Sequence, residues 1–136
     1  MDSLSQQRRS ENMSRIRSKN TSPELQVRRL VHAMGYRYRL HDKSLPGKPD
    51  LVFRSRKIVI FVHGCFWHLH ASCNEGRIPA TRQEYWIPKL TRNVERDRQH
   101  ARTLKKLGWR VLTVWECELK SQDKLVRRLT RFFSQS

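Results

Sequence analysis

Several kinds of sequence feature are missing from this chain of 136 residues, and each absence excludes a class of protein. The longest unbroken apolar run, Ile58 to Val62, is far shorter than the about 18 residues that a membrane-spanning helix needs. No apolar segment follows the basic residues near the N-terminus, as a secretory signal would require. Cysteine is rare, and the three present are an odd number, which argues against a disulfide framework. We therefore expect no membrane partner and a cytoplasmic location.

Acidic residues are also scarce, and the charge balance points to a polyanionic partner. The chain carries 29 lysines and arginines against 12 acids, a formal net charge of +17 with a sequence pI near 11.0. The basic residues recur from Arg8 to Arg131 instead of forming one tail, which is typical of a folded nucleic-acid-binding protein. From the length we expect a basic N-terminal arm at 1–20 that binds the phosphate backbone, and one domain at 21–136.

The apolar patterning predicts an α/β domain with a mixed central sheet flanked by helices. A helix starts at Ser22, whose hydroxyl caps it, and ends at Gly35. We expect strands at 36–40, 50–53, 58–62 and 109–115, a short helix at 84–90 interrupted at Pro88, a long helix from Asn93 to Gly108, and a last helix capped by Ser121 or Asp123. The helix residues predicted to face the core are Leu25, Leu30, Val31, Met34, Val94, Ala101, Leu104, Leu107, Leu125, Leu129 and Phe132.

The segment after the most apolar strand is rich in metal ligands. The pattern Cys65-x4-His70-x2-Cys73 offers three ligands that suit tetrahedral zinc, and Cys117 follows the last strand as a fourth. On spacing alone, His63 or His68 could replace His70. Since residues 64–82 contain few apolar side chains, we expect a structural zinc ion to hold them in place.

An acid and a histidine are predicted to meet at one end of the sheet. Asp50 opens one strand and His63 closes its antiparallel neighbour. Phosphodiester nucleases use a carboxylate in such a position to bind Mg²⁺. In the PD-(D/E)xK restriction endonucleases the second strand carries an acid and a lysine, but residues 60–63 here contain neither. His63 and His68 are therefore the candidates for proton transfer.

Several multi-residue motifs follow one another in a fixed order along the chain. They are Pro46-Gly47-x-Pro49-Asp50, His63-Gly64-Cys65-Phe66-Trp67-His68, Pro79-Ala80-Thr81-Arg82 with Tyr85-Trp86, Asn93-x-Glu95-Arg96-Asp97, and Leu107-Gly108-Trp109-Arg110-Val111 with Trp115-Glu116-Cys117. With these motifs the chain resembles one family of DNA repair enzymes, the very-short-patch repair (Vsr) endonucleases. The resemblance spans roughly residues 8 to 120.

The resemblance implies a restriction-endonuclease-like fold and a Mg²⁺-dependent nick on the 5′ side of the mispaired thymine in a T:G mismatch, the product of 5-methylcytosine deamination. It implies that Asp50 binds Mg²⁺, that His68 pairs with Asp97, and that His63 pairs with Glu24. The zinc ligands it implies are Cys65, His70, Cys73 and Cys117. The residues implied to enter the base stack are Phe66, Trp67 and Trp86, with Met13 reaching the opposite groove.

The family also implies double-stranded DNA with a T:G mismatch as the substrate and mismatch-repair proteins as further partners, in a bacterial protein associated with the nucleoid. We expect a monomer. Two other functions fit the charge and the metal ligands: a non-catalytic, zinc-stapled nucleic-acid-binding module, and a restriction-type nuclease that cuts intact sites. Nicking of mismatched against matched duplexes separates the three.

Overall fold

A computed structural model of the chain describes residues 21–71 and 73–135. Its centre is a mixed sheet of four strands in the order β1-β2-β3-β4. Successive strands pair antiparallel as far as β3, and β4 runs parallel to β3. The mixed sheet is as predicted, although the first strand is much shorter than the predicted 36–40. The strands are β1 (Arg39–Leu40), β2 (Leu51–Phe53), β3 (Ile58–His63) and β4 (Arg110–Trp115).

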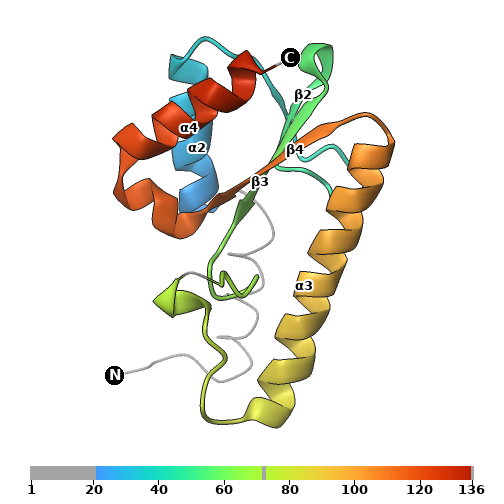
Figure 1. The fold of residues 1–136 in the computed structure, drawn as a ribbon, viewed down its shortest axis with the longest axis vertical. Helices are drawn as coiled ribbons and strands as arrows, with labels where there is room; N and C mark the ends of the chain where they lie inside the picture. The colour runs from blue at the N-terminus through green and yellow to red at the C-terminus, as the bar shows by residue number, and fades with distance from the viewer. Residues whose placement is uncertain (1–20, 72, 136) are drawn as a thin grey trace.

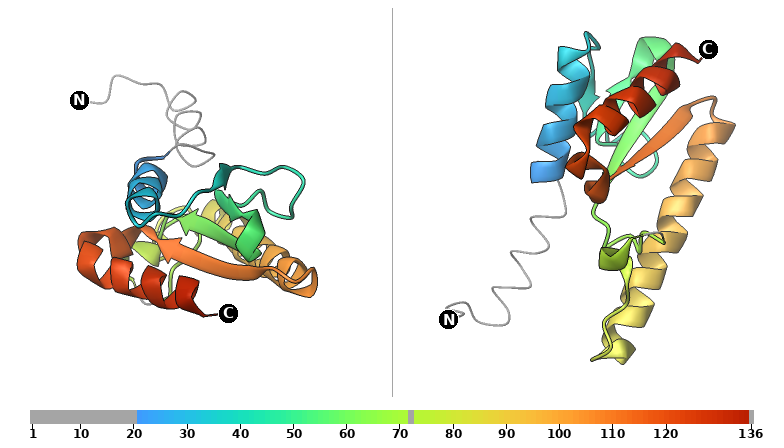
Figure 2. Two further views of the ribbon diagram at one scale, coloured as in Figure 1. Left: turned by 90° about the horizontal axis from the view of Figure 1, so that it is seen from above. Right: turned by 60° about the vertical axis from the view of Figure 1, so that its left-hand side comes forward.

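Helices cover both faces of this sheet. Among the described residues, α2 (Ser22–Ala33) and α4 (Gln122–Ser134) lie on one face, and α3 (Gln83–Lys106) lies on the other (Figure 1). The view from above shows the sheet enclosed between these layers (Figure 2). Three short 3-10 helices complete the described structure: η1 (Arg54–Arg56), η2 (Asn74–Gly76) and η3 (Glu116–Lys120).

The side chains of β3 point alternately to the two faces of the sheet, and the core is thereby divided into two parts. Ile58 and Ile60 face α2 and α4, whereas Val59 and Phe61 pack with Leu104 of α3. Successive side chains of a strand point to opposite faces, so this alternation fixes the side of every later residue on β3. His63, two residues after Phe61, therefore faces α3.

The first helix differs from the prediction in its cap and in its buried face. The cap is Thr21, whose hydroxyl accepts a hydrogen bond from the Glu24 N–H at 3.3 Å. Val27 lies in the core, whereas Leu25 is 37% exposed. The predicted end is correct, since Gly35 follows the helix with a φ of +95°, which suits glycine.

The predicted break at Pro88 is wrong, because α3 is one continuous helix of 24 residues that includes this proline. A proline inside a helix costs the hydrogen bond that its own nitrogen would donate, here near the exposed start of the helix. Leu104 faces the core as predicted, but Leu107 follows the helix end and is 55% exposed.

The last helix buries a slightly different stripe from the predicted one. Leu125 and Leu129 lie in the core as expected, but the third buried residue is Phe133 and Phe132 is half-buried. The Phe133 ring stacks on Tyr36 at a centroid distance of 4.0 Å. None of the described helices is long and apolar enough to cross a membrane.

Candidate active site

Asp50 lies where the β2–β3 hairpin opens, as the sequence predicted. Its Oδ2 accepts a hydrogen bond from the Val62 N–H at 2.7 Å, and its backbone carbonyl accepts one from the His41 N–H at 3.2 Å. Burial, together with the Glu24 carboxylate alongside, raises the pKa of Asp50 to about 7, against the opposing effect of the Val62 hydrogen bond. The side chain is thus held rigidly where an ionised carboxylate is unfavourable without a cation.

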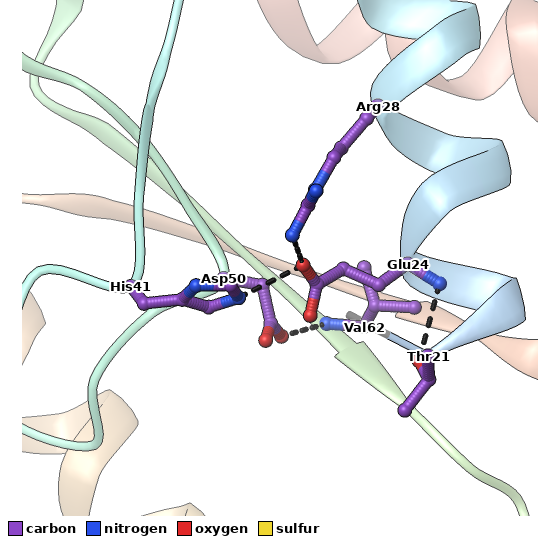
Figure 3. A network of polar contacts seen from close by, with 6 residues as sticks. All are labelled: Thr21, Glu24, Arg28, His41, Asp50 and Val62. Carbon is purple, nitrogen blue, oxygen red and sulfur yellow. Dashed lines mark hydrogen bonds and ion pairs between the residues drawn. The ribbon is translucent and has the colours of Figure 1, made fainter. Parts of the chain in front are cut away.

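Glu24 brings a second carboxylate to the same place from the first turn of α2. It is 2% exposed, and its Oε2 accepts hydrogen bonds from His41 Nε2 at 2.8 Å and from Arg28 on the next turn of the helix. Figure 3 shows these side chains converging beside Asp50. One ligand atom each from Glu24, His41 and Asp50 lie within 4.8 Å of one another. Two carboxylates this close form a candidate metal centre, with the His41 imidazole beside them as a hydrogen-bond donor to Glu24.

On the α3 side of the sheet end, two histidines and an acid form a second group. His68 Nδ1 donates a hydrogen bond to Asp97 Oδ2 at 2.5 Å. The His63 ring stacks on the His68 ring with centroids 3.8 Å apart and planes 6° apart. Burial, with His68 alongside, lowers the pKa of His63 to about 3, so this imidazole is neutral at neutral pH. The Asp97 bond fixes the His68 tautomer and leaves Nε2 for proton transfer.

The implied pairing of His63 with Glu24 is not what the structure shows. Strand alternation turns His63 toward α3, whereas Glu24 approaches from α2 on the opposite face. Among the described residues, His63 Nδ1 has no hydrogen-bond partner, and Glu24 bonds His41 instead. The two residues therefore lie in different layers around Asp50.

Asp50 and His68 each line two hollows. A cleft of about 520 Å³ runs along α3 and includes His63, Asp97 and His100 in its wall. A smaller hollow of about 100 Å³ lies on the α2 side and is also lined by Glu24 and Glu116. Because Asp50 and His68 line both hollows, this carboxylate and this imidazole border the cleft on the α3 side as well as the hollow on the α2 side.

The cysteines converge on a separate site. The ligand atoms of Cys65, His70, Cys73 and Cys117 lie within 4.8 Å of one another. His70 Nδ1 is 3.7 Å from Cys65 Sγ and 3.4 Å from Cys117 Sγ. Zinc bonded to sulfur and nitrogen in a tetrahedron holds its ligand atoms about 3.5 to 3.8 Å apart, so the four residues fit such an ion.

The ambiguity that spacing left is resolved by this arrangement, since His70 joins the cysteines while His63 and His68 lie in the other group. The His70 ring stacks on Trp115 of β4, with centroids 4.2 Å apart and planes 8° apart. Trp115 thus supports the metal ligand and lines the cleft, whereas Trp109 is buried in the α3-side core.

The aromatic residues implied to enter DNA gather in one cluster at the start of α3. Phe66 lies with its ring centroid 5.0 Å from that of Trp67 and 5.2 Å from that of Trp86. The Tyr85 ring lies 4.9 Å from Trp86, and Lys89 Nζ lies 5.6 Å from the Trp67 ring centroid. All three predicted aromatic residues remain half-exposed. Met13 and the arm at 1–20 lie outside the residues that the structure describes.

Sequence reasoning missed His41 and Arg28. Neither belongs to a motif with a chemical signature, and Arg28 is one of many basic residues. The signal for His41 was register: Leu40 pairs with Leu51 across the antiparallel ladder, which places the next residue opposite Asp50. A two-residue β1 is too short for its register to be predicted from apolar periodicity.

Comparisons with known proteins agree with this geometry. A family model described as DNA mismatch endonuclease Vsr matches residues 1–75. The chain is 50% identical over 135 residues to type II nicking enzyme V.XorIIP of Xanthomonas oryzae pv. oryzae, covering 99% of this chain and 98% of the relative. It is 48% identical over 117 residues to DNA mismatch endonuclease Vsr of Escherichia coli, covering 86% and 74%.

A solved structure supports the fold. The catalytic domain of homing endonuclease I-Bth0305I matches with a TM-score of 0.58 and 24% sequence identity, covering 84% of this chain and 95% of that domain. At this level of identity the likeness concerns the arrangement of helices and strands only.

Proposed function

Because the chain belongs to the Vsr family of DNA nicking endonucleases, we propose that it makes a Mg²⁺-dependent nick 5′ of the mispaired thymine in a T:G mismatch. The observation that carries the proposal is that Asp50 and the hydrogen-bonded pair of His68 and Asp97 line one cleft. The substrate is double-stranded DNA, in keeping with the net charge of +17. One of the relatives is itself named a DNA mismatch endonuclease.

Asp50 and Glu24 are the residues proposed to hold magnesium. Their carboxylate oxygens are the ligand type that Mg²⁺ prefers, and the Val62 N–H keeps Asp50 aimed at the hollow. When bound, magnesium would polarise the scissile phosphate and favour ionisation of the attacking water. The buried acids fit this group, because a cation offsets the cost of ionising Asp50 beside Glu24.

His68 is proposed to exchange the proton. Asp97 holds Nδ1–H and His68 lines the hollow, so Nε2 of the same ring is left to exchange a proton with water or with the leaving oxygen. His63 supports this ring by stacking and stays neutral, which avoids repulsion when His68 becomes positively charged.

The four predicted zinc ligands and the aromatic cluster are proposed to support the nicking reaction without contacting the scissile phosphate. Zinc on Cys65, His70, Cys73 and Cys117 would hold the loop that carries His68. Phe66, Trp67 and Trp86 would insert beside the mispair, where unstacking costs less than in a matched duplex. We further propose a single nuclease domain at 21–136, related to the PD-(D/E)xK fold, with an arm at 1–20 along the DNA.

The test is a nicking assay on duplexes that differ at one base pair, with and without Mg²⁺. The proposal expects a single cut in the thymine strand of the T:G duplex, little cutting of the T:A and C:G duplexes, and loss of cutting in Asp50→Ala while DNA binding survives. Equal cutting of matched and mismatched duplexes would instead favour a restriction-type nickase. Full cutting by Asp50→Ala would refute the assigned site.

A further inference from the structure

We propose that His41 is a positioning residue for the nicking reaction: through its Nε2–H it holds the Glu24 carboxylate beside Asp50. The inference rests on the proposed magnesium-dependent function of that site. It concerns a residue outside the motifs that the chain shares with the family.

His41 is tied to Asp50 through the backbone. It follows β1 directly, and its N–H donates to the Asp50 carbonyl at 3.2 Å. Its φ is +48°, a left-handed conformation that residues other than glycine adopt infrequently. Local strain of this kind is concentrated at functional sites. The residue with this conformation is the one whose imidazole Nε2 hydrogen-bonds to Glu24.

Glu24 needs partners because its side chain is 2% exposed and lies next to another carboxylate. Arg28 and His41 both donate to the same oxygen, Oε2 (Figure 3). Their roles differ, because Arg28 lies on α2 with Glu24 and moves with it. His41 directly follows β1 and is bonded to the Asp50 backbone, so its side-chain bond ties the acid from the helix to the acid from the hairpin.

This cross-element bond sets the separation of the two carboxylates before any metal arrives. Partners that orient metal ligands in this way typically change metal affinity or activity by about 10- to 100-fold when they are removed. Loss of the His41 bond should therefore weaken magnesium binding and slow nicking, without changing the contacts to DNA.

Two amide substitutions, His41→Gln and His41→Asn, form a matched pair for the test. The glutamine amide nitrogen reaches about as far as histidine Nε2 and can donate to Glu24, whereas asparagine is one methylene too short. Asparagine tolerates positive φ better than glutamine. A purely structural role thus favours the Asn variant, and a positioning role favours the Gln variant.

The measurements are the Mg²⁺ dependence of nicking at saturating T:G duplex, and calorimetric titration of the DNA-free protein with MgCl₂. We expect His41→Asn to lower Mg²⁺ affinity and kcat by about 10- to 100-fold with KM for DNA unchanged, and His41→Gln to stay within about threefold of wild type. His32→Asn, an exposed histidine on the last turn of α2, is the control and should match wild type.

A double-mutant cycle identifies the residue through which His41 acts. In a Glu24→Gln background, His41→Asn should cause little further loss of Mg²⁺ affinity or kcat, because the carboxylate it positions is gone. A full additional loss there, or a Gln variant as impaired as the Asn variant, would overturn the inference. So would an Asn variant equal to wild type in both measurements. Wild-type protein that fails to nick T:G DNA would instead refute the proposed function.

Discussion

Replacement of Asp50 by asparagine should abolish nicking and yet stabilise the protein in the absence of magnesium. Asparagine keeps an oxygen that can accept the Val62 N–H bond, and it removes a carboxylate that is buried beside Glu24. The pKa of Asp50 rises from 3.8 to about 7 in the folded chain. Each pKa unit corresponds to about 1.4 kcal/mol, so this rise means that ionised Asp50 lowers the free energy of unfolding by about 4 kcal/mol.

The sign and the pH window follow from linkage. Below about pH 4 the Asp50 carboxyl is protonated in both the folded and the unfolded chain, and it does not reduce the free energy of unfolding. Between about pH 4 and 7 the unfolded chain gives up the proton while the folded chain keeps it, so stability falls as pH rises. Above pH 7 Asp50 is ionised in both states, and the full reduction in the free energy of unfolding is present. Since solvent in the cleft screens part of it, we expect Asp50→Asn to be more stable than wild type by roughly 2 to 4 kcal/mol at pH 8, and by less than half of that at pH 5.

Urea unfolding at pH 5 and pH 8, in buffers without added magnesium and with zinc retained, measures this difference. Adding Mg²⁺ at pH 8 should narrow it, because the cation stabilises only the wild-type carboxylate pair. Asp42→Asn is the matched control: hydrogen bonds from Ser44 lower the pKa of Asp42, so that substitution should not stabilise the protein at pH 8. An Asp50→Asn variant no more stable than wild type at pH 8 would refute the reasoning.

Three further predictions concern the zinc set, the aromatic cluster and the charge. Cys117→Ser should release zinc and lower the melting temperature of the domain, since it breaks a site that links η3 to the 65–73 loop; elemental analysis and calorimetry check both, and an unchanged zinc content would contradict the assignment. Trp67→Ala should reduce the preference for T:G over matched duplexes in competitive binding, whereas an equal loss for both would argue against insertion into the stack. If 6 to 10 phosphates are contacted, affinity for DNA should fall about 10³- to 10⁵-fold between 50 and 200 mM salt, and a shallow salt dependence would argue against extensive backbone contact.

The β2–β3 hairpin could be predicted because two local signals agreed. The apolar run at 58–62 predicts a strand buried on both faces, and the four hydrophilic residues before it, 54–57, favour a tight connection. Asp50 then had to lie across from the end of that strand. The grouping of the cysteines followed from ligand chemistry, although the histidine among them required the fold.

The buried face of α2 is carried by a local pattern, because Val27 with Leu30, Val31 and Met34 has the i, i+3, i+4, i+7 spacing of one helix face and Leu25 lies outside it. Other parts of the site depended on tertiary structure that no local pattern encodes. The continuity of α3 through Pro88 depends on packing that outweighs one missing hydrogen bond. His41, a partner of Glu24, was missed because it follows a strand of two residues whose register only the assembled sheet defines.

The length and continuity of α3 have a consequence for how sensing and cutting are linked. This helix carries Trp86 near its start and Asp97 midway, so the ring and the acid that bonds His68 belong to one continuous helix. If Trp86 enters the base stack and His68 acts at the scissile phosphate, as proposed, the distance between these two points on the DNA is set by this helix. Deleting one residue between them would swing the ring by about 100° relative to the acid, and a duplex seated correctly at one end would be misaligned at the other.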